Sequence, residues 1–115
     1  MTLRELLTQY PDKFYPQTWY WDEAFLDTDA PTIADMPGDI IDSGHRLPAH
    51  SIDLPNAAQL AALWLEHPDH ILWAKYLWCC DTDAQGQHVY VGQNGHGLEI
   101  HRHIHLTSRF VIPTW

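Results

Sequence analysis

The sequence predicts one α+β domain in which two helices pack on a C-terminal three-stranded antiparallel β-meander, with a long irregular acidic loop between the helices. Three observations carry this prediction. Apolar residues recur at helical spacing in two segments, the last third of the chain alternates apolar and polar residues as strands do, and residues 27–55 hold four prolines without a lasting period. The length of 115 residues suits one core, so we assign residues 1–115 to a single domain.

The first helix is predicted from Thr2 to the proline at position 11. Thr2 and Glu5 have the spacing of a capping box. The apolar residues recur at i, i+3, i+4 and i+7, at Leu3, Leu6, Leu7 and Tyr10. An aromatic stretch follows over residues 14–21. We expect about half of its rings to close the core over the second helix, and the stretch allows a short strand.

The second helix is predicted from about residue 55 to residue 66. Asp53 or Leu54 would cap it, Pro55 suits the first turn, and Pro68 lies just beyond its end. Apolar residues nearly encircle this segment, which argues for deep burial, with Trp64 among the buried side chains.

The strands are predicted in the last third of the chain. Residues 71–80 are apolar on both faces and favour a central strand, with a helix capped by Asp69 as the alternative. Residues 88–93 form the next strand, Asn94-Gly95 favours a tight hairpin turn, and the last strand follows to residue 112. In that last strand most even positions are apolar, so the even face is predicted to pack on the core.

The hairpin has two possible registers of the same phase. A two-residue loop at Asn94-Gly95 pairs His88 with His101, and a four-residue loop through Gly97 pairs His88 with His103. In both registers His88 joins the polar face of the last strand. That face would carry four histidines and one carboxylate, namely His88, Glu99, His101, His103 and His105.

This histidine surface is a candidate metal site. Residues two apart on a strand are separated by ~6.6–6.8 Å, and residues four apart by ~13 Å, so one ion could take one histidine pair plus His88 or Glu99. Solvent-facing histidines without an ion are the alternative. We expect no cofactor, with a divalent metal as the exception.

The segment from residue 100 to residue 106, Ile-His-Arg-His-Ile-His-Leu, resembles the signature of the histidine-triad family, in which three histidines alternate with apolar residues. Arg102 stands at an apolar position of that signature, and Thr107 ends it. The resemblance covers fewer than about ten residues. It implies nucleotide hydrolysis or transfer with His103 as the nucleophile.

Residues 81–86, Asp-Thr-Asp-Ala-Gln-Gly, resemble the first half of a calcium-binding loop. The position at which such a loop needs a bidentate Glu is Gly92. A polar hairpin loop is therefore predicted here.

The charge balance excludes some partners. The chain has 15 acidic and 6 basic residues and a formal net charge of −9, and no Lys or Arg occurs from residue 14 to residue 45. Such a surface repels nucleic acid and anionic membranes and attracts basic surfaces. No run approaches the ~20 apolar residues of a membrane span, and charge at Arg4 and Glu5 comes too early for a secretory signal. We therefore expect a cytoplasmic protein.

The chain has two cysteines, the adjacent Cys79 and Cys80. Neighbouring side chains of a strand point to opposite faces, so these two cannot bridge without strain. They are predicted to be plain buried thiols.

Aromatic residues beside the acidic stretch form a candidate partner-binding surface, since Trp and Tyr are frequent at the centres of interfaces. Its residues are Trp19, Trp21, Asp22, Glu23, Asp27, Asp29, Asp35 and Asp39. A solvated loop with a packed aromatic lid is the alternative. Because the acidic stretch offers no local cation, its carboxylates are expected to stay mostly exposed.

Two functions follow from these patterns. The first is a small acidic interaction protein without chemistry of its own, which covers a basic, nucleic-acid-binding surface of a partner protein, as phage-encoded inhibitors and immunity proteins do. The second is a small hydrolase or metal protein that uses the histidine surface. The sequence contains no phosphate-binding glycine loop and no complete catalytic constellation, so we expect the first and no enzymatic activity.

Overall fold

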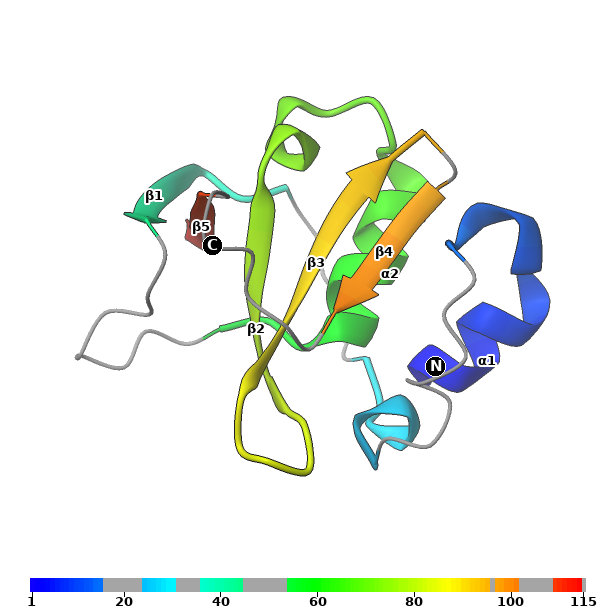
Figure 1. Ribbon diagram of the computed structural model, residues 1–115. Helices are drawn as coiled ribbons and strands as arrows, with labels where there is room; N and C mark the ends of the chain where they lie inside the picture. The colour runs from blue at the N-terminus through cyan, green and yellow to red at the C-terminus, as the bar shows by residue number, and fades with distance from the viewer. Residues whose placement is uncertain (16–23, 31–35, 45–53, 96, 102–108, 115) are drawn as a thin grey trace.

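The computed structural model describes residues 1–15, 24–30, 36–44, 54–95, 97–101 and 109–114 (Figure 1). Its helices are α1 (Leu3–Gln9) and α2 (Ala57–Glu66), with the short 3₁₀ segments η1 (Pro11–Lys13), η3 (Ala24–Asp27) and η4 (Ile71–Ala74). Its strands are β1 (Asp39–Gly44), β2 (Tyr76–Thr82), β3 (His88–Asn94), β4 (Gly97–His101) and β5 (Phe110–Thr114). The α+β class is therefore confirmed. None of the helices in the described ranges is long and apolar enough to span a membrane.

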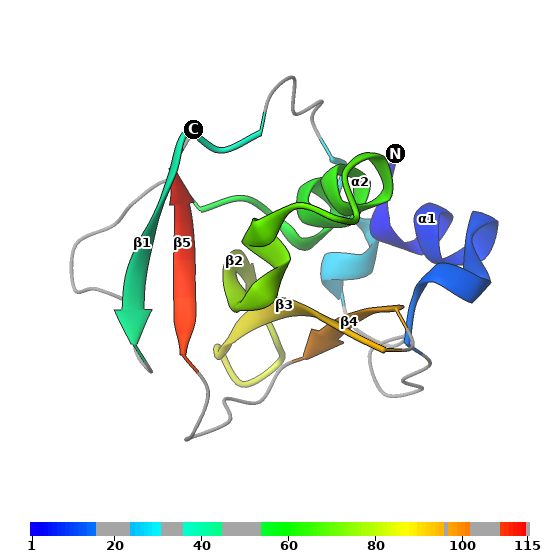
Figure 2. The same ribbon diagram turned by 90° about the horizontal axis from the view of Figure 1, so that it is seen from above.

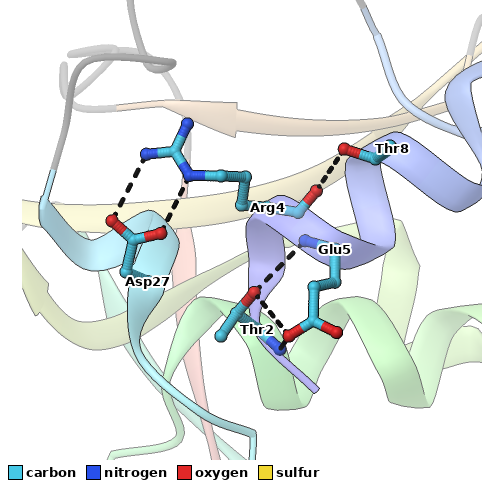
Figure 3. Close-up of polar contacts among 5 residues, drawn as sticks. All are labelled: Thr2, Arg4, Glu5, Thr8 and Asp27. Atoms are coloured by element: carbon cyan, nitrogen blue, oxygen red, sulfur yellow. Dashed lines mark hydrogen bonds and ion pairs between the residues drawn. The ribbon is translucent and has the colours of Figure 1, made fainter.

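Helix α1 forms where its caps and spacing predict it. The Thr2 side chain accepts a hydrogen bond from the Glu5 backbone N–H, and the Glu5 side chain reaches back to the Thr2 N–H, so the capping box is complete (Figure 3). Leu3, Leu6 and Leu7 are buried. Tyr10 ends the helix and is exposed.

Helix α2 is also confirmed, but its predicted cap is wrong. Asn56 is the N-cap and forms a second capping box with Gln59, while Pro55 precedes the helix. The predicted caps, Asp53 and Leu54, precede Asn56 in the sequence. A proline just before the N-cap and a proline in the first turn of a helix give the same sequence pattern, so the pattern did not distinguish the two positions. Trp64 is 5% exposed, so its predicted burial is confirmed, and it packs against the buried Phe14 of the aromatic stretch.

The prediction of a three-stranded antiparallel meander is wrong. The sheet has five strands in the order β1-β5-β2-β3-β4, and it is mixed, because β5 pairs parallel to β2 and antiparallel to β1. The predicted last strand is two strands, β4 and β5, at separate places in the sheet. The strand β1 lies in the segment predicted as irregular loop.

A continuous alternation of apolar residues hid the break between β4 and β5. Leu98 and Ile100 of β4 belong to the core beneath the helices, whereas Phe110 and Ile112 of β5 lie in a second cluster. The odd residue Val111 takes the place of an even one in the helix-side core. An alternation of apolar residues indicates a strand, but it does not indicate which face of the sheet those residues occupy.

Both faces of the sheet are apolar. The helix-side core contains the buried residues of α1 and α2 and the strand residues that face them, including Leu77, Val89 and Val91. The other face carries an aromatic cluster, which we define as Tyr76, Trp78, Tyr90 and Phe110. Trp78 stacks on Phe110 with ring centroids 4.5 Å apart, and Tyr90 meets Phe110 edge-on at 5.0 Å.

The segment predicted as a central strand at 71–80 divides into η4 and β2. His70, and not Asp69, caps η4, because its side chain accepts the Leu72 N–H. Helix α2 lies over β2, β3 and β4, while β1 and β5 extend past the helices on the other side of the molecule (Figure 2). The strand β1 therefore forms an edge of the sheet that neither α1 nor α2 covers.

Candidate functional site

A half-open groove lies between the start of β1 and η4. It has a volume of about 240 Å³ and is lined by residues 37–40 on one side and by His70, Ile71 and Leu72 on the other. Ile71 at its rim is 80% exposed, the largest exposed fraction among the exposed large apolar side chains of the described residues. One exposed isoleucine is common on a protein surface, so its meaning depends on whether other exposed apolar side chains lie beside it.

Two more isoleucines are exposed on β1. Ile40 lines the groove and is 38% exposed, and Ile41 is 43% exposed. Neighbouring strand residues project to opposite faces, so the edge of the sheet carries an exposed isoleucine on each face. We define the β1 edge surface as Asp39, Ile40, Ile41 and Asp42 together with Ile71.

The carboxylates of the β1 edge surface differ in their pairing. Asp42 accepts hydrogen bonds from Arg109 Nη2 at 2.7 Å and Nε at 3.0 Å, and Lys75 Nζ lies 4.0 Å away. The Arg109 hydrogen bonds, with a further one from the Gly44 N–H, hold the pKa of Asp42 below its ordinary value. Asp39 accepts the N–H of Ile40 at 2.8 Å and meets no cation among the described residues.

Cationic groups from the start of the chain also pair with Asp27 and Asp29, at the other end of the acidic stretch. Arg4 donates to both carboxylate oxygens of Asp27, at 2.8 and 3.4 Å (Figure 3), and these bonds lower the pKa of Asp27. The N-terminal ammonium lies 3.8 Å from Asp29. The stretch has no local cation in sequence, but the fold supplies cations to Asp27, Asp29 and Asp42.

The predicted partner-binding residues are therefore only partly described. Asp27, Asp29 and Asp39 are exposed, as predicted, and so is Asp42. Of the three predicted residues, Asp39 alone lies in the groove. The others of the predicted set, Trp19, Trp21, Asp22, Glu23 and Asp35, lie outside the described residues.

The hairpin that carries the histidines has the second of its two predicted registers. Asn94 pairs with Gly97, Val91 with Ile100 and Tyr90 with His101. Glu99 lies opposite Gly92, and Gly92 is four residues from His88. Glu99 and His88 are therefore ~13 Å apart along the strands and cannot share one ion. The side chain of His101, together with His103 and His105, lies outside the described residues.

His88 lies against the aromatic cluster. Its side chain is half-buried, and its ring meets Trp78 edge-on at 6.4 Å. Its Nδ1 lies 2.8 Å from the Cys79 carbonyl oxygen, which can only accept, so Nδ1 carries the proton and Nε2 has the lone pair in the neutral form. No group of three or more metal-ligating side chains occurs within the described ranges, and the histidine metal site stays a prediction.

One predicted buried thiol is confirmed and the other is wrong. Cys79 is fully buried, while Cys80 is exposed, because the helix side covers one face of β2 at this position and the other is open. Burial, helped by the charge of Asp81, raises the pKa of both thiols, that of Cys79 well above its ordinary 9.0. Both are neutral thiols near pH 7.

The loop that resembles half of a calcium site is a polar hairpin loop, as predicted. Asp83 is buried, and its Oδ1 accepts the backbone N–H groups of Gln85 and Gln87 at 2.9 and 3.0 Å. Asp81 turns to the helix side instead, where its Oδ2 accepts the Ala57 N–H at 2.6 Å. The two carboxylates thus serve a turn and the N-terminus of α2.

The Asp81 carboxylate gives a pH-dependent prediction. Burial raises its pKa above the ordinary 3.8 and outweighs the Ala57 hydrogen bond, which lowers it. The folded state therefore holds the Asp81 proton more tightly than the unfolded state does, and this contribution to stability is lost as pH rises through the folded pKa. The variant Asp81→Asn retains an acceptor without charge. As pH rises through the folded pKa of Asp81, wild type should therefore lose stability relative to this variant.

The measurement is urea unfolding of both proteins at pH values from below 3.8 to neutral. Asp81→Ala is the control, because it removes the acceptor as well as the charge and should be less stable than Asp81→Asn by about 1 kcal/mol at every pH. A difference between wild type and Asp81→Asn that does not change with pH would contradict the assignment.

The sequence indicated Asp39 but not the isoleucines around it. Ile40 and Ile41 stand between two aspartates in a proline-rich segment, and Ile71 stands at the start of a segment with the pattern of a buried strand. Two adjacent β-branched residues between acidic ones could have marked a short edge strand. Comparison of the chain with protein-family models, with curated proteins and with solved structures found no significant match.

Proposed function

We propose that the protein is an interaction module that binds a basic partner protein through the β1 edge surface and thereby covers a nucleic-acid-binding surface of that partner. The observation that supports this most is the exposure of Ile40, Ile41 and Ile71 beside Asp39, in a chain with a net charge of −9. The proposal requires no catalytic group.

The composition of the surface suits such a role. Interfaces combine an apolar centre with a polar and charged rim. Here the groove and the three isoleucines provide the apolar part, and Asp39 and Asp42 provide the charged part. Removing these apolar side chains from water under a partner would stabilise the complex.

The negative net charge of the protein favours a partner with a positively charged surface. Asp42 is already paired with Arg109, so Asp39 is the carboxylate of this surface with room for a new cation among the described residues. The net charge of −9 adds a field that speeds the approach of a basic protein and weakens with added salt. A basic protein that binds nucleic acid has the complementary surface.

The proposal predicts the effect of a double variant on partner capture. Asp39→Asn with Ile71→Ser should weaken binding of the captured protein by about tenfold or more, since it removes the unpaired carboxylate and the most exposed apolar side chain. Asp12→Asn is the matched control, because it removes one exposed carboxylate in η1, at a distance from the groove.

The measurement has two stages. Proteins retained by the immobilised wild type at low salt are identified and purified, and the affinity of each for wild type and for both variants is measured. A nucleic acid bound to the captured protein should be displaced by wild type and not by the double variant. Equal affinity for the double variant and wild type, or a partner that keeps its nucleic acid in the complex, would refute the proposal.

A further inference from the structure

The backbone pairing of β1 leaves hydrogen-bonding groups directed outward. Ile40 lies opposite Pro113 of β5, and proline has no N–H to donate. This pair is therefore a non-hydrogen-bonded one, and the N–H and C=O of Ile40 point away from β5. By the same alternation Asp42, opposite Val111, also directs its N–H and C=O outward. No described segment pairs with this side of β1.

We propose that an extended segment of the basic partner adds to this edge as a sixth strand of the sheet. This inference rests on the proposed function and specifies how the partner is held. Strand addition satisfies the outward groups of Ile40 and Asp42 through main-chain hydrogen bonds and leaves side-chain pockets to set specificity. The irregularity between Asp42 and Gly44 limits the pairing to residues 39–42.

The side chains at the edge match an incoming strand. Such a strand presents its residues alternately to the two faces of the sheet. On one face they would cover Ile40 and enter the groove beside Ile71, and on the other they would cover Ile41. These are the exposed isoleucines of the described residues, and one added strand accounts for all three.

Asp39 now occupies the place of the incoming strand. Its Oδ1 accepts the outward N–H of Ile40 at 2.8 Å, as a main-chain carbonyl of a sixth strand would. When that carbonyl replaces it, the Asp39 carboxylate becomes free to pair with a Lys or Arg of the same segment. The inferred ligand is therefore a strand in which basic and apolar residues alternate.

A second copy of this chain is the less favourable occupant. Pairing two β1 edges would bring Asp39 and Asp42 of both copies together, and each copy carries a net charge of −9. Charged residues on an edge strand deter such self-association. They favour a basic segment by the same electrostatics.

The test uses a short peptide in which lysine and valine alternate, and a control peptide with glutamate in place of lysine. The 115-residue chain should bind the lysine peptide, with an affinity that falls as salt rises, and bind the glutamate peptide far more weakly. Bound peptide should slow hydrogen exchange at the N–H groups of Ile40 and Asp42, because main-chain hydrogen bonds of a sixth strand would shield both groups from water, which the exposed Asp39 carboxylate on the Ile40 N–H does not.

The variant Ile40→Pro removes the outward N–H but no bond to β5, and proline is tolerated on an edge strand when its N–H side faces solvent. It should weaken binding of the lysine peptide by about tenfold or more. Ile40→Thr is the matched control, since it keeps the N–H and should change the affinity by less than about threefold. Unfolding curves of both variants show whether the fold is retained.

The outcomes separate this inference from the proposed function. Salt-dependent binding that is equal for wild type and Ile40→Pro, without slower exchange at Ile40, overturns strand addition and leaves the acidic binding surface in place. Equal binding of the lysine and glutamate peptides, or binding of neither, overturns both. A dimer of the free protein that Ile40→Pro dissociates would show that a second copy is the occupant and overturn the choice of a basic segment.

Discussion

Replacing Trp78 with alanine is expected to lower the free energy of unfolding by about 3–5 kcal/mol, because it empties the centre of the aromatic cluster. Trp78 is 2% exposed, stacks on Phe110 at 4.5 Å and meets Tyr90 edge-on at 6.4 Å. A small domain is stable by only about 5–15 kcal/mol, so this loss is a large part of the total.

The same change affects the position of β1. Trp78 Nε1 donates to Ser43 Oγ at 3.0 Å, and Ser43 Oγ donates in turn to the Phe110 carbonyl oxygen at 2.9 Å. This chain of bonds links β1, β5 and β2 on the face away from the helices. Loss of Trp78 should therefore loosen the edge strand that carries the proposed binding surface.

Trp78→Phe separates packing from hydrogen bonding. It keeps an aromatic ring on Phe110 and removes the Nε1 donor, so it should cost about 1–3 kcal/mol, less than Trp78→Ala. Both values come from urea unfolding at a fixed pH. Equal losses for the two variants would contradict the importance assigned to the ring stack.

The second large effect is expected for Gly97→Ala, which should cost about 3 kcal/mol or more from backbone strain and a clash. The φ of Gly97 is +128°, a conformation that side chains with a Cβ rarely adopt. A Cβ at this position would also clash with the Lys13 carbonyl oxygen. The backbone of η1 approaches β4 closely here, and Tyr15 donates its N–H to the Leu98 carbonyl at 2.9 Å.

Two other glycines serve as controls for this prediction. Gly86 has a φ of +80°, and a Cβ added there would have nothing within 4 Å, so Gly86→Ala should show the strain alone, about 1 kcal/mol. Gly95 has open space and no positive φ, and Gly95→Ala should change little. If Gly97→Ala and Gly86→Ala lowered stability by the same amount, the close approach of Lys13 would have no energetic weight.

The candidate site was predictable only in its charge. Asp39 follows from the acidic stretch, because carboxylates without local cations stay in water, and the described ones do. The groove was not predictable, since residues 37–40 and 70–72 lie far apart in sequence and meet only after the sheet has formed. Ile71 resembles a core residue in sequence, but the turn of η4 leaves it 80% exposed.

The sequence by itself determined the elements whose signals are local. The Thr2–Glu5 capping box and the apolar face of α2 are short-range signals, and the structure has α1 and α2 where they predict them. The β3–β4 hairpin also forms, but its turn was predicted at Asn94-Gly95 and lies one residue later, because Asn94 is the last residue of β3 and pairs with Gly97. Hydrophobic spacing and cap chemistry are properties of short segments, so they can be recognised without the rest of the chain.

Only the tertiary structure decided where β1 and β5 pair and which carboxylates are neutralised. The Arg109–Asp42 ion pair joins residues 67 apart, and β5 enters the sheet between β1 and β2, far from its sequence neighbour β4. Alternation of apolar residues is the same in β4 and β5, although their even-numbered residues bury opposite faces. Such choices depend on which surfaces remain to be covered once the local elements have formed, because strand order and edge position are set by long-range packing and not by any local period.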